Sequence, residues 1–144
     1  MKKLLLFALL AVMCVFNSSC KDDDDDHNDD AAVEYHAHIM SPDATDKNVG
    51  DDIHIHVNFE EPDGATIHHV NVKIYNKDDN SIVIFDEPSE AHVHADGTYE
   101  VHGDVTLDGD VLAHTDWVME AKAWGHEAGE GEVMETVEFH VHPE

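Results

Sequence analysis

The sequence has no arginine and only two cysteines, and its seven basic residues are set against 33 acidic ones. The formal net charge of −26 repels phosphate backbones and anionic lipid headgroups, so the composition argues against a nucleic-acid partner. Cys14 and Cys20 both fall in the first twenty residues. The body of the chain therefore has neither an internal disulfide nor a thiolate metal site.

Familiar catalytic motifs are also missing. The sequence contains no glycine-rich phosphate loop, no zinc-protease helix signature and no serine nucleophile elbow. After the first twenty residues, no window shows a convincing 3.6-residue period of apolar side chains, which argues against helices of useful length. We therefore expect a protein built from strands that is not an enzyme.

The first nineteen residues have the layout of a secretory signal peptide. A short positive start is followed by an unbroken apolar run, Leu4 to Phe16, which is too short to span a bilayer as a stable helix. The small and polar residues that end at Cys20 resemble the lipobox of bacterial lipoproteins, although Asn17 stands where an apolar residue is usual. The resemblance implies that residues 1–19 are removed and that Cys20 is fatty-acylated. An ordinary secreted protein cut nearby is the alternative.

Residues 20–32 are predicted to be this lipidated cysteine and an acidic tether. Lys21 is followed by the aspartates 22–26, and a run of like charges without apolar residues stays solvated. The run resembles the acidic export signal of surface lipoproteins in the Bacteroidetes. That resemblance implies a lipid anchor in the outer membrane, with the protein on the cell surface. A spacer at the periplasmic face is the alternative.

Beyond the tether, apolar residues recur at every second position, as at Ile53 and Ile55, which predicts strands with one face in a core. Turn-forming residues separate the predicted strands, which are 33–40, 53–59, 70–75, 81–85, 91–95, 99–107, 115–124 and 133–142. Seven to eight short strands in a domain of residues 33–144 indicate an all-β fold, an antiparallel β-sandwich of immunoglobulin-like type. An up-and-down barrel is the alternative. We expect Trp117 in the core and Trp124 partly exposed.

Histidine is the abundant residue, with fourteen in the chain. Four pairs have His-x-His spacing and alternate with apolar residues, so both imidazoles of each pair lie on the solvent face, roughly 6.5–7 Å apart. Imidazoles at that spacing can converge on zinc or copper, and a neighbouring strand can add a third ligand. The predicted ligands are His36, His38, His54, His56, His92, His94, His102, His140 and His142.

The predicted strand pairing divides the histidines between two sheets. The first sheet would hold His36, His38, His54, His56, His92, His94 and His102, and the second His69, His126, His140 and His142. His68 shares the parity of Val70, which predicts a buried, hydrogen-bonded side chain that points inward. Met40 and Met134 share parity with nearby histidines, and a thioether there would favour copper over zinc.

The segment from Val49 to Val57, VGDDIHIHV, resembles the opening of domain-of-unknown-function family 4625, found in lipoproteins of the Bacteroidetes. The resemblance covers about residues 33–142 and implies a small β-sandwich with histidine-rich strands after a lipidated cysteine. The histidines favour a lipoprotein that binds zinc or copper. The alternative is a surface interaction or adhesion module for a protein or glycan, in which the histidines are solvated filler or a pH-responsive patch.

Overall fold

The structure is a computed structural model that describes residues 34–87, 91–109, 111, 113–127 and 129–143. The predicted signal peptide of residues 1–19, Cys20 and the tether of residues 20–32 lie outside the described residues, and so do the side chains of His92 and His94. No helix in the described part of the chain is long and apolar enough to cross a membrane.

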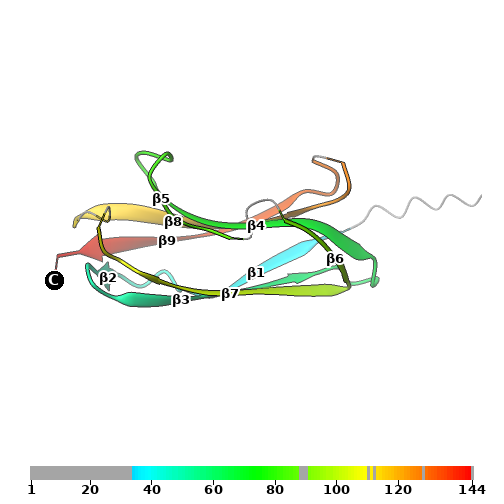
Figure 1. The fold of residues 1–144 in the computed structure, drawn as a ribbon, viewed down its shortest axis with the longest axis horizontal. Helices are drawn as coiled ribbons and strands as arrows, with labels where there is room; N and C mark the ends of the chain where they lie inside the picture. The colour runs from blue at the N-terminus through cyan, green and yellow to red at the C-terminus, as the bar shows by residue number, and fades with distance from the viewer. Residues whose placement is uncertain (1–33, 88–90, 110, 112, 128, 144) are drawn as a thin grey trace, which may run out of the picture.

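The described residues form nine strands in two sheets that pack face to face (Figure 1). The strands are β1 (His36–Ser41), β2 (Lys47–Asn48), β3 (Asp52–Glu60), β4 (Thr66–Asn76), β5 (Val83–Asp86), β6 (Ala91–Asp96), β7 (Thr98–Thr106), β8 (Thr115–Trp124) and β9 (Val133–His142). The predicted all-β sandwich is therefore confirmed. Every predicted strand is present, and β2 is an addition that is too short for any alternation to reveal.

One sheet has three strands in the order β1-β3-β7, and the other has the order β2-β9-β8-β4-β5, with β6 also paired to β4. The ladders are antiparallel except for β2, which runs parallel to the C-terminal end of β9. The immunoglobulin-like type of the sandwich stays a prediction.

The alternation of the sequence places the core between the sheets. On β3, Ile55, Val57 and Phe59 are fully buried, whereas His54 is exposed. Trp117 on β8 is also fully buried, as predicted, and Trp124 is half-buried. Because the inward positions are apolar, the polar positions of the same strands, the histidines among them, lie on the two outer faces.

One expectation about individual histidines is met only in part, and another is wrong. The ladder between β4 and β6 shifts register between Ile67 and His69, so Ile67 takes the buried position and His68 is half-buried, although its Nδ1 atom exposes less than 1 Å². β6 pairs with β4, and the chain enters the three-stranded sheet only after Gly97, where β7 begins. His92 and His94 therefore belong to the six-stranded sheet and do not share a sheet with His54 and His56.

Candidate metal centres

The end of the six-stranded sheet brings three imidazoles together. His140 and His142 are on β9, and His114 directly precedes β8, the neighbouring strand. One ring nitrogen of each residue lies within 4.8 Å of the others, and we call these residues the three-histidine cluster. Zinc with tetrahedral Zn–N bonds of about 2.0–2.1 Å needs its nitrogens roughly 3.3 Å apart. Modest side-chain rotations would therefore close the cluster on an ion.

Two of these rings are held by carboxylates. His140 Nδ1 is 2.6 Å from Asp116 Oδ1, and His142 Nε2 is 3.0 Å from Asp46 Oδ2. An ionised carboxylate only accepts hydrogen bonds, so these two nitrogens carry the proton, and the other nitrogen of each neutral ring keeps its lone pair. Metal-binding histidines commonly donate their second N–H to a carboxylate, which orients the ring and raises its basicity.

Strand pairing supplies both carboxylates. Asp116 lies directly opposite His140 in the ladder between β8 and β9. Asp46 comes just before β2, which pairs with the last residues of β9. The two carboxylates therefore approach β9 from its two neighbours in the sheet, and each meets one histidine.

His114 has an unusual backbone conformation. Its φ is 60°, and no other residue with a Cβ has a positive φ in the described part of the chain. The left-handed region costs roughly 1–2 kcal/mol for such residues, and strain of this kind concentrates at functional sites. The His114 N–H donates to the Val141 carbonyl oxygen at 2.7 Å. The ring of His114 lies 6.1 Å from that of His140 and 6.0 Å from that of His142, between centroids.

A second group lies on the outer face of the three-stranded sheet. His56 on β3 and His102 on β7 are opposite one another in the antiparallel ladder, and their rings stack with centroids 4.3 Å apart. Glu100 is two residues before His102 on the same face, with Oε2 3.3 Å from His102 Nε2. One donor atom of each residue lies within 4.8 Å of the others, and we call this group the two-histidine cluster.

The Nε2 atom of His56 exposes less than 1 Å² and has no hydrogen-bond partner among the described residues. A buried polar atom without a partner costs roughly 1–3 kcal/mol, so such atoms usually mark a bound water, an ion or a functional role. His54, two residues earlier on β3, differs in this respect, because its Nδ1 lies 2.9 Å from Asp104 Oδ1.

Of the other predicted ligands, His36, His38 and His54 lie outside both clusters, and the side chains of His92 and His94 are not among those described. His36 and His38 stack on one another on β1, with ring centroids 6.2 Å apart. The His54 ring is 6.0 Å from that of His102, between centroids. The backbones of His92 and His94 belong to β6.

His69, His140 and His142 of the second predicted set share a sheet but not a site, and His126 lies in the loop after β8. His69 pairs with Trp124 at one end of β8, whereas His140 pairs with Asp116 near the other end. The eight residue steps from Asp116 to Trp124 span roughly 27 Å of strand. The expectation that His69 groups with His140 and His142 is therefore wrong.

Met40 and Met134 are the predicted thioether candidates. Both side chains are largely exposed, Met40 at 63% and Met134 at 51%. A preference for copper therefore stays a prediction.

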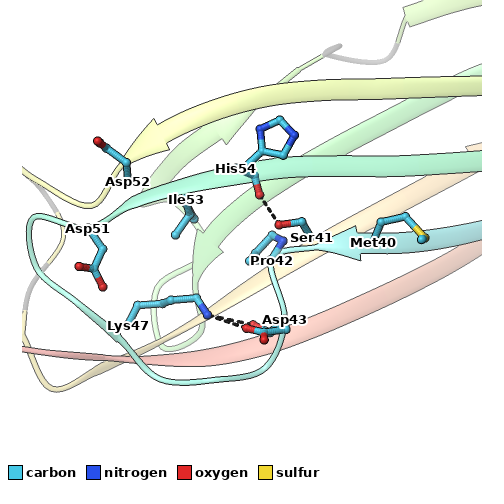
Figure 2. Close-up of a pocket in the computed structure, with 9 residues that line it drawn as sticks. All are labelled: Met40, Ser41, Pro42, Asp43, Lys47, Asp51, Asp52, Ile53 and His54. Carbon is cyan, nitrogen blue, oxygen red and sulfur yellow. Dashed lines mark hydrogen bonds and ion pairs between the residues drawn. The ribbon is translucent and has the colours of Figure 1, made fainter.

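A shallow cleft lies beside Met40, where β1 ends (Figure 2). It is lined by Met40, Ser41, Pro42, Asp43, Lys47, Asp51, Asp52, Ile53 and His54. His54 contributes its backbone, and not its ring, to the contacts drawn there. Its carbonyl oxygen accepts a hydrogen bond from the Ser41 hydroxyl at 2.7 Å. The cleft therefore offers no second imidazole to a metal.

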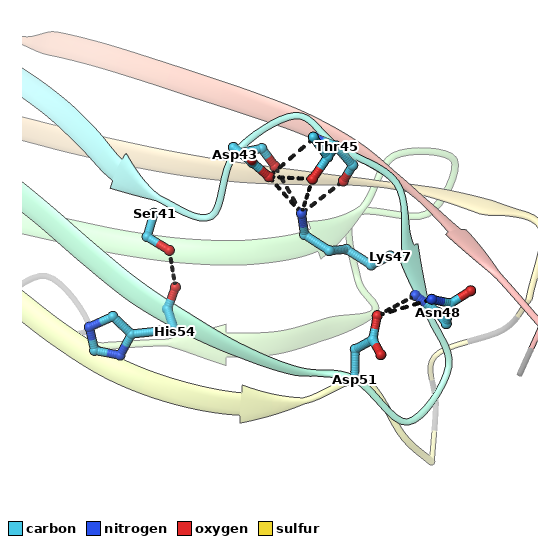
Figure 3. A network of polar contacts seen from close by, with 7 residues as sticks. All are labelled: Ser41, Asp43, Thr45, Lys47, Asn48, Asp51 and His54. Atoms are coloured by element: carbon cyan, nitrogen blue, oxygen red, sulfur yellow. Dashed lines mark hydrogen bonds and ion pairs between the residues drawn. The ribbon is translucent and has the colours of Figure 1, made fainter.

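The polar network beside this cleft is built around Asp43 (Figure 3). Lys47 Nζ donates to Asp43 Oδ1 at 2.7 Å, and the Thr45 hydroxyl donates to the same oxygen at 2.5 Å. These hydrogen bonds, led by that from Lys47, lower the pKa of Asp43 to about 2. The network holds the loop between β1 and β2, and Asp46, the partner of His142, lies in that loop.

Sequence reasoning did not assign His114 or Glu100 to a site, nor Asp116 and Asp46, the carboxylates that hold His140 and His142. His114 is not part of a His-x-His pair, but the spacing His114-x-Asp116 is the same as that of His140-x-His142 on the neighbouring strand. A search for any two metal-donor residues, histidine or carboxylate, that are separated by one residue would have found His114. The same search would have joined Glu100 to His102.

No protein-family model matches the chain, and no curated protein matches it. The resemblance to family 4625 stays a prediction. Among solved structures, the chain is similar to the beta-glucosidase from Listeria innocua, in complexes with glucose and with gluconolactone, at 13% sequence identity and a TM-score of 0.42. The similarity covers 78% of this chain and 17% of that chain. The likeness is too loose to inform on activity.

Proposed function

We propose that the protein binds a transition-metal ion, zinc or copper, at the three-histidine cluster. The observation that carries the proposal is the convergence of three ring nitrogens within 4.8 Å, two of them on rings that Asp116 and Asp46 orient. Imidazole nitrogen is a good donor for both metals. Three protein ligands leave a fourth position for water or for a side chain of a partner.

The position of the cluster favours capture and release over permanent structural binding. His114 is exposed, and His140 and His142 are half-buried, so an ion would remain in contact with solvent. The acidic surface attracts cations, with a reach of about 8 Å at physiological salt. We propose a non-catalytic role in acquisition, buffering or delivery of the ion to a partner protein.

The test is calorimetric titration of the full chain, purified without a polyhistidine tag, with Zn²⁺ and with Cu²⁺. At about pH 7.4 we expect saturable binding, and at about pH 5.5 we expect its loss, because protonated imidazole cannot ligate. Unsaturable uptake at both pH values would contradict the proposal.

A matched pair of variants locates the ion. The double variant H140Q/H142Q should lose binding at the three-histidine cluster. H36Q/H38Q removes the same number of histidines from an exposed strand, but His36 and His38 belong to neither cluster. It should bind as the unmodified chain does. Equal loss in both variants would show that the histidines act as a diffuse cation-binding surface.

The place of this activity is proposed from the sequence. We propose that Cys20 is lipidated and that residues 20–32 tether the domain to the outer membrane at the cell surface. Metabolic labelling with a radioactive fatty acid should mark the chain, and C20S should abolish the label. Removal of the domain from intact cells by added protease would support the outer face, and protection from protease would place it in the periplasm.

A further inference from the structure

We infer that the two-histidine cluster is a second, independent site for a divalent transition-metal ion. It rests on donors that the proposed function does not use: His56, Glu100 and His102. β3 and β7 belong to the three-stranded sheet, whereas β8 and β9 belong to the six-stranded sheet. Because both clusters face outward and the core lies between the sheets, no ion can be shared between them.

Two observations point to a ligand at this place. The first is the convergence of the three donors within 4.8 Å. The second is the buried Nε2 atom of His56, which has no hydrogen-bond partner among the described residues. A bound cation would satisfy that atom and would also replace the 3.3 Å contact between His102 and Glu100 with two stronger bonds to the ion.

The backbone beneath the cluster is held by continuous strand pairing between β3 and β7. His56 and His102 are opposed within a ladder that pairs every residue from Asp52 to Glu60 with a residue of β7. A Cβ on Gly103 would lie 2.7 Å from Cε2 of Phe85, a residue of the facing sheet. The missing side chain thus lets Phe85 pack directly against β7 behind His102. The ligand-bearing strands would need only side-chain rotation to bind an ion.

The donor set predicts the kind of ion. Two imidazoles and one carboxylate form a mixed nitrogen and oxygen site, a combination that holds zinc in several enzymes. The carboxylate oxygen is a harder donor than imidazole and brings a negative charge, so the site favours a divalent ion over Cu(I). The three-histidine cluster has only nitrogen donors.

The experiment is the stoichiometry of Zn²⁺ binding to the full, untagged chain at about pH 7.4, above the ordinary imidazole pKa. We expect two ions for the unmodified chain, one for H56Q/H102Q, one for H140Q/H142Q and none for the four-fold variant. H36Q/H38Q is again the control and should keep two. E100Q should lower the Zn²⁺ affinity of the two-histidine cluster by roughly tenfold or more, because the loss of a group that only supports a metal ligand already costs about that much.

The two proposals fail in different ways. If H56Q/H102Q still binds two ions, the second site is overturned, whatever happens at the three-histidine cluster. If H140Q/H142Q still binds two ions, the proposed function is wrong and the second site survives only if H56Q/H102Q loses one. Because a variant could lose metal by unfolding, each is checked by circular dichroism. NMR of the ring nitrogens of the unmodified chain gives an independent readout: Zn²⁺ should shift His56 Nε2, and an unmoved His56 signal at saturation would overturn the second site.

Discussion

The Nε2 atom of His142 lies 3.0 Å from Oδ2 of Asp46, a residue 96 positions earlier in the chain. The contact joins the loop before β2 to the last strand of the sheet, because β2 pairs with the end of β9. It is largely exposed, with 44% of the His142 side chain and 62% of the Asp46 side chain accessible. An exposed pair of this kind contributes roughly 0–1 kcal/mol to stability, so its main effect is on the orientation of the ring.

Replacing this carboxylate should therefore weaken metal binding without unfolding the protein. D46N keeps the size of the side chain but removes its charge, and we expect Zn²⁺ affinity at the three-histidine cluster to fall roughly 10- to 100-fold. The free energy of unfolding should change by less than about 1 kcal/mol. D104N is the matched control, because Asp104 holds His54, which belongs to neither cluster. Equal loss of affinity in both variants would point to surface charge as the cause.

Removing the backbone strain at His114 should raise the stability of the protein while lowering its affinity for metal. Glycine adopts the left-handed conformation without the clash of a Cβ, so H114G should stabilise the metal-free protein by up to about 1 kcal/mol. The same change removes one of three ligands, so Zn²⁺ affinity should fall. H114A removes the ligand while keeping the Cβ, and it should lose affinity without the gain in thermal midpoint. A less stable H114G would mean that the side chain supports the fold.

Filling the space at Gly103 should disturb the packing behind the two-histidine cluster. The methyl group of G103A would meet the ring end of Phe85 at 2.7–2.8 Å, and we expect a loss of about 1 kcal/mol in the free energy of unfolding. Phe85 is only half-buried, so its ring can give way in part. In a background of F85L, which lacks the clashing atoms, G103A should cost clearly less. If G103A and F85L change the free energy of unfolding, measured with denaturant, by amounts that simply add in the double variant, the two residues do not interact.

The pKa of Asp43 gives a prediction for acid conditions. It is lowered from 3.8 to about 2, first by the hydrogen bond from Lys47 and then by those from Thr45. A carboxyl group with a lowered pKa in the folded state stabilises the protein above its unfolded pKa, and the stabilisation is lost as the pH falls through the folded value. The contribution should therefore be complete above about pH 4 and disappear toward pH 2.

K47M tests this by removing the main donor while keeping the length of the side chain. The pKa of Asp43, followed by carboxyl carbon NMR, should rise toward its ordinary range. The difference in thermal midpoint between K47M and the unmodified protein should shrink as the pH falls from about 4 to about 2. An unchanged Asp43 titration would show that the Lys47 contact is not maintained in solution.

Much of the fold follows from apolar alternation, because burial on one face of a strand leaves a direct trace in the sequence. That trace identified the core positions of β3 and placed Trp117 correctly. It fails where the two-residue period is interrupted. The register shift after Ile67 moves His68 out of the inward set, and its trace in the sequence is the three-residue spacing between the apolar residues Ile67 and Val70.

The candidate sites were harder to predict because each combines residues from different strands. The spacing of His140 and His142 shows that they share a face, but only strand pairing brings His114 and Asp46 to them. The pairing of β6 with β4 likewise removes His92 and His94 from the sheet of His54. Spacing along one strand indicates which side chains point the same way, whereas a metal site depends on which strands are neighbours.

The wide sequence separation of the residues that meet at β9 has a consequence for biogenesis. This strand carries two members of the three-histidine cluster, and the carboxylates that orient them come from residues 46 and 116. An emerging chain has no such cluster until β9 has docked between β2 and β8. The three-histidine cluster therefore forms only after β9 has docked, whereas the two-histidine cluster lies on β3 and β7 and does not depend on β9.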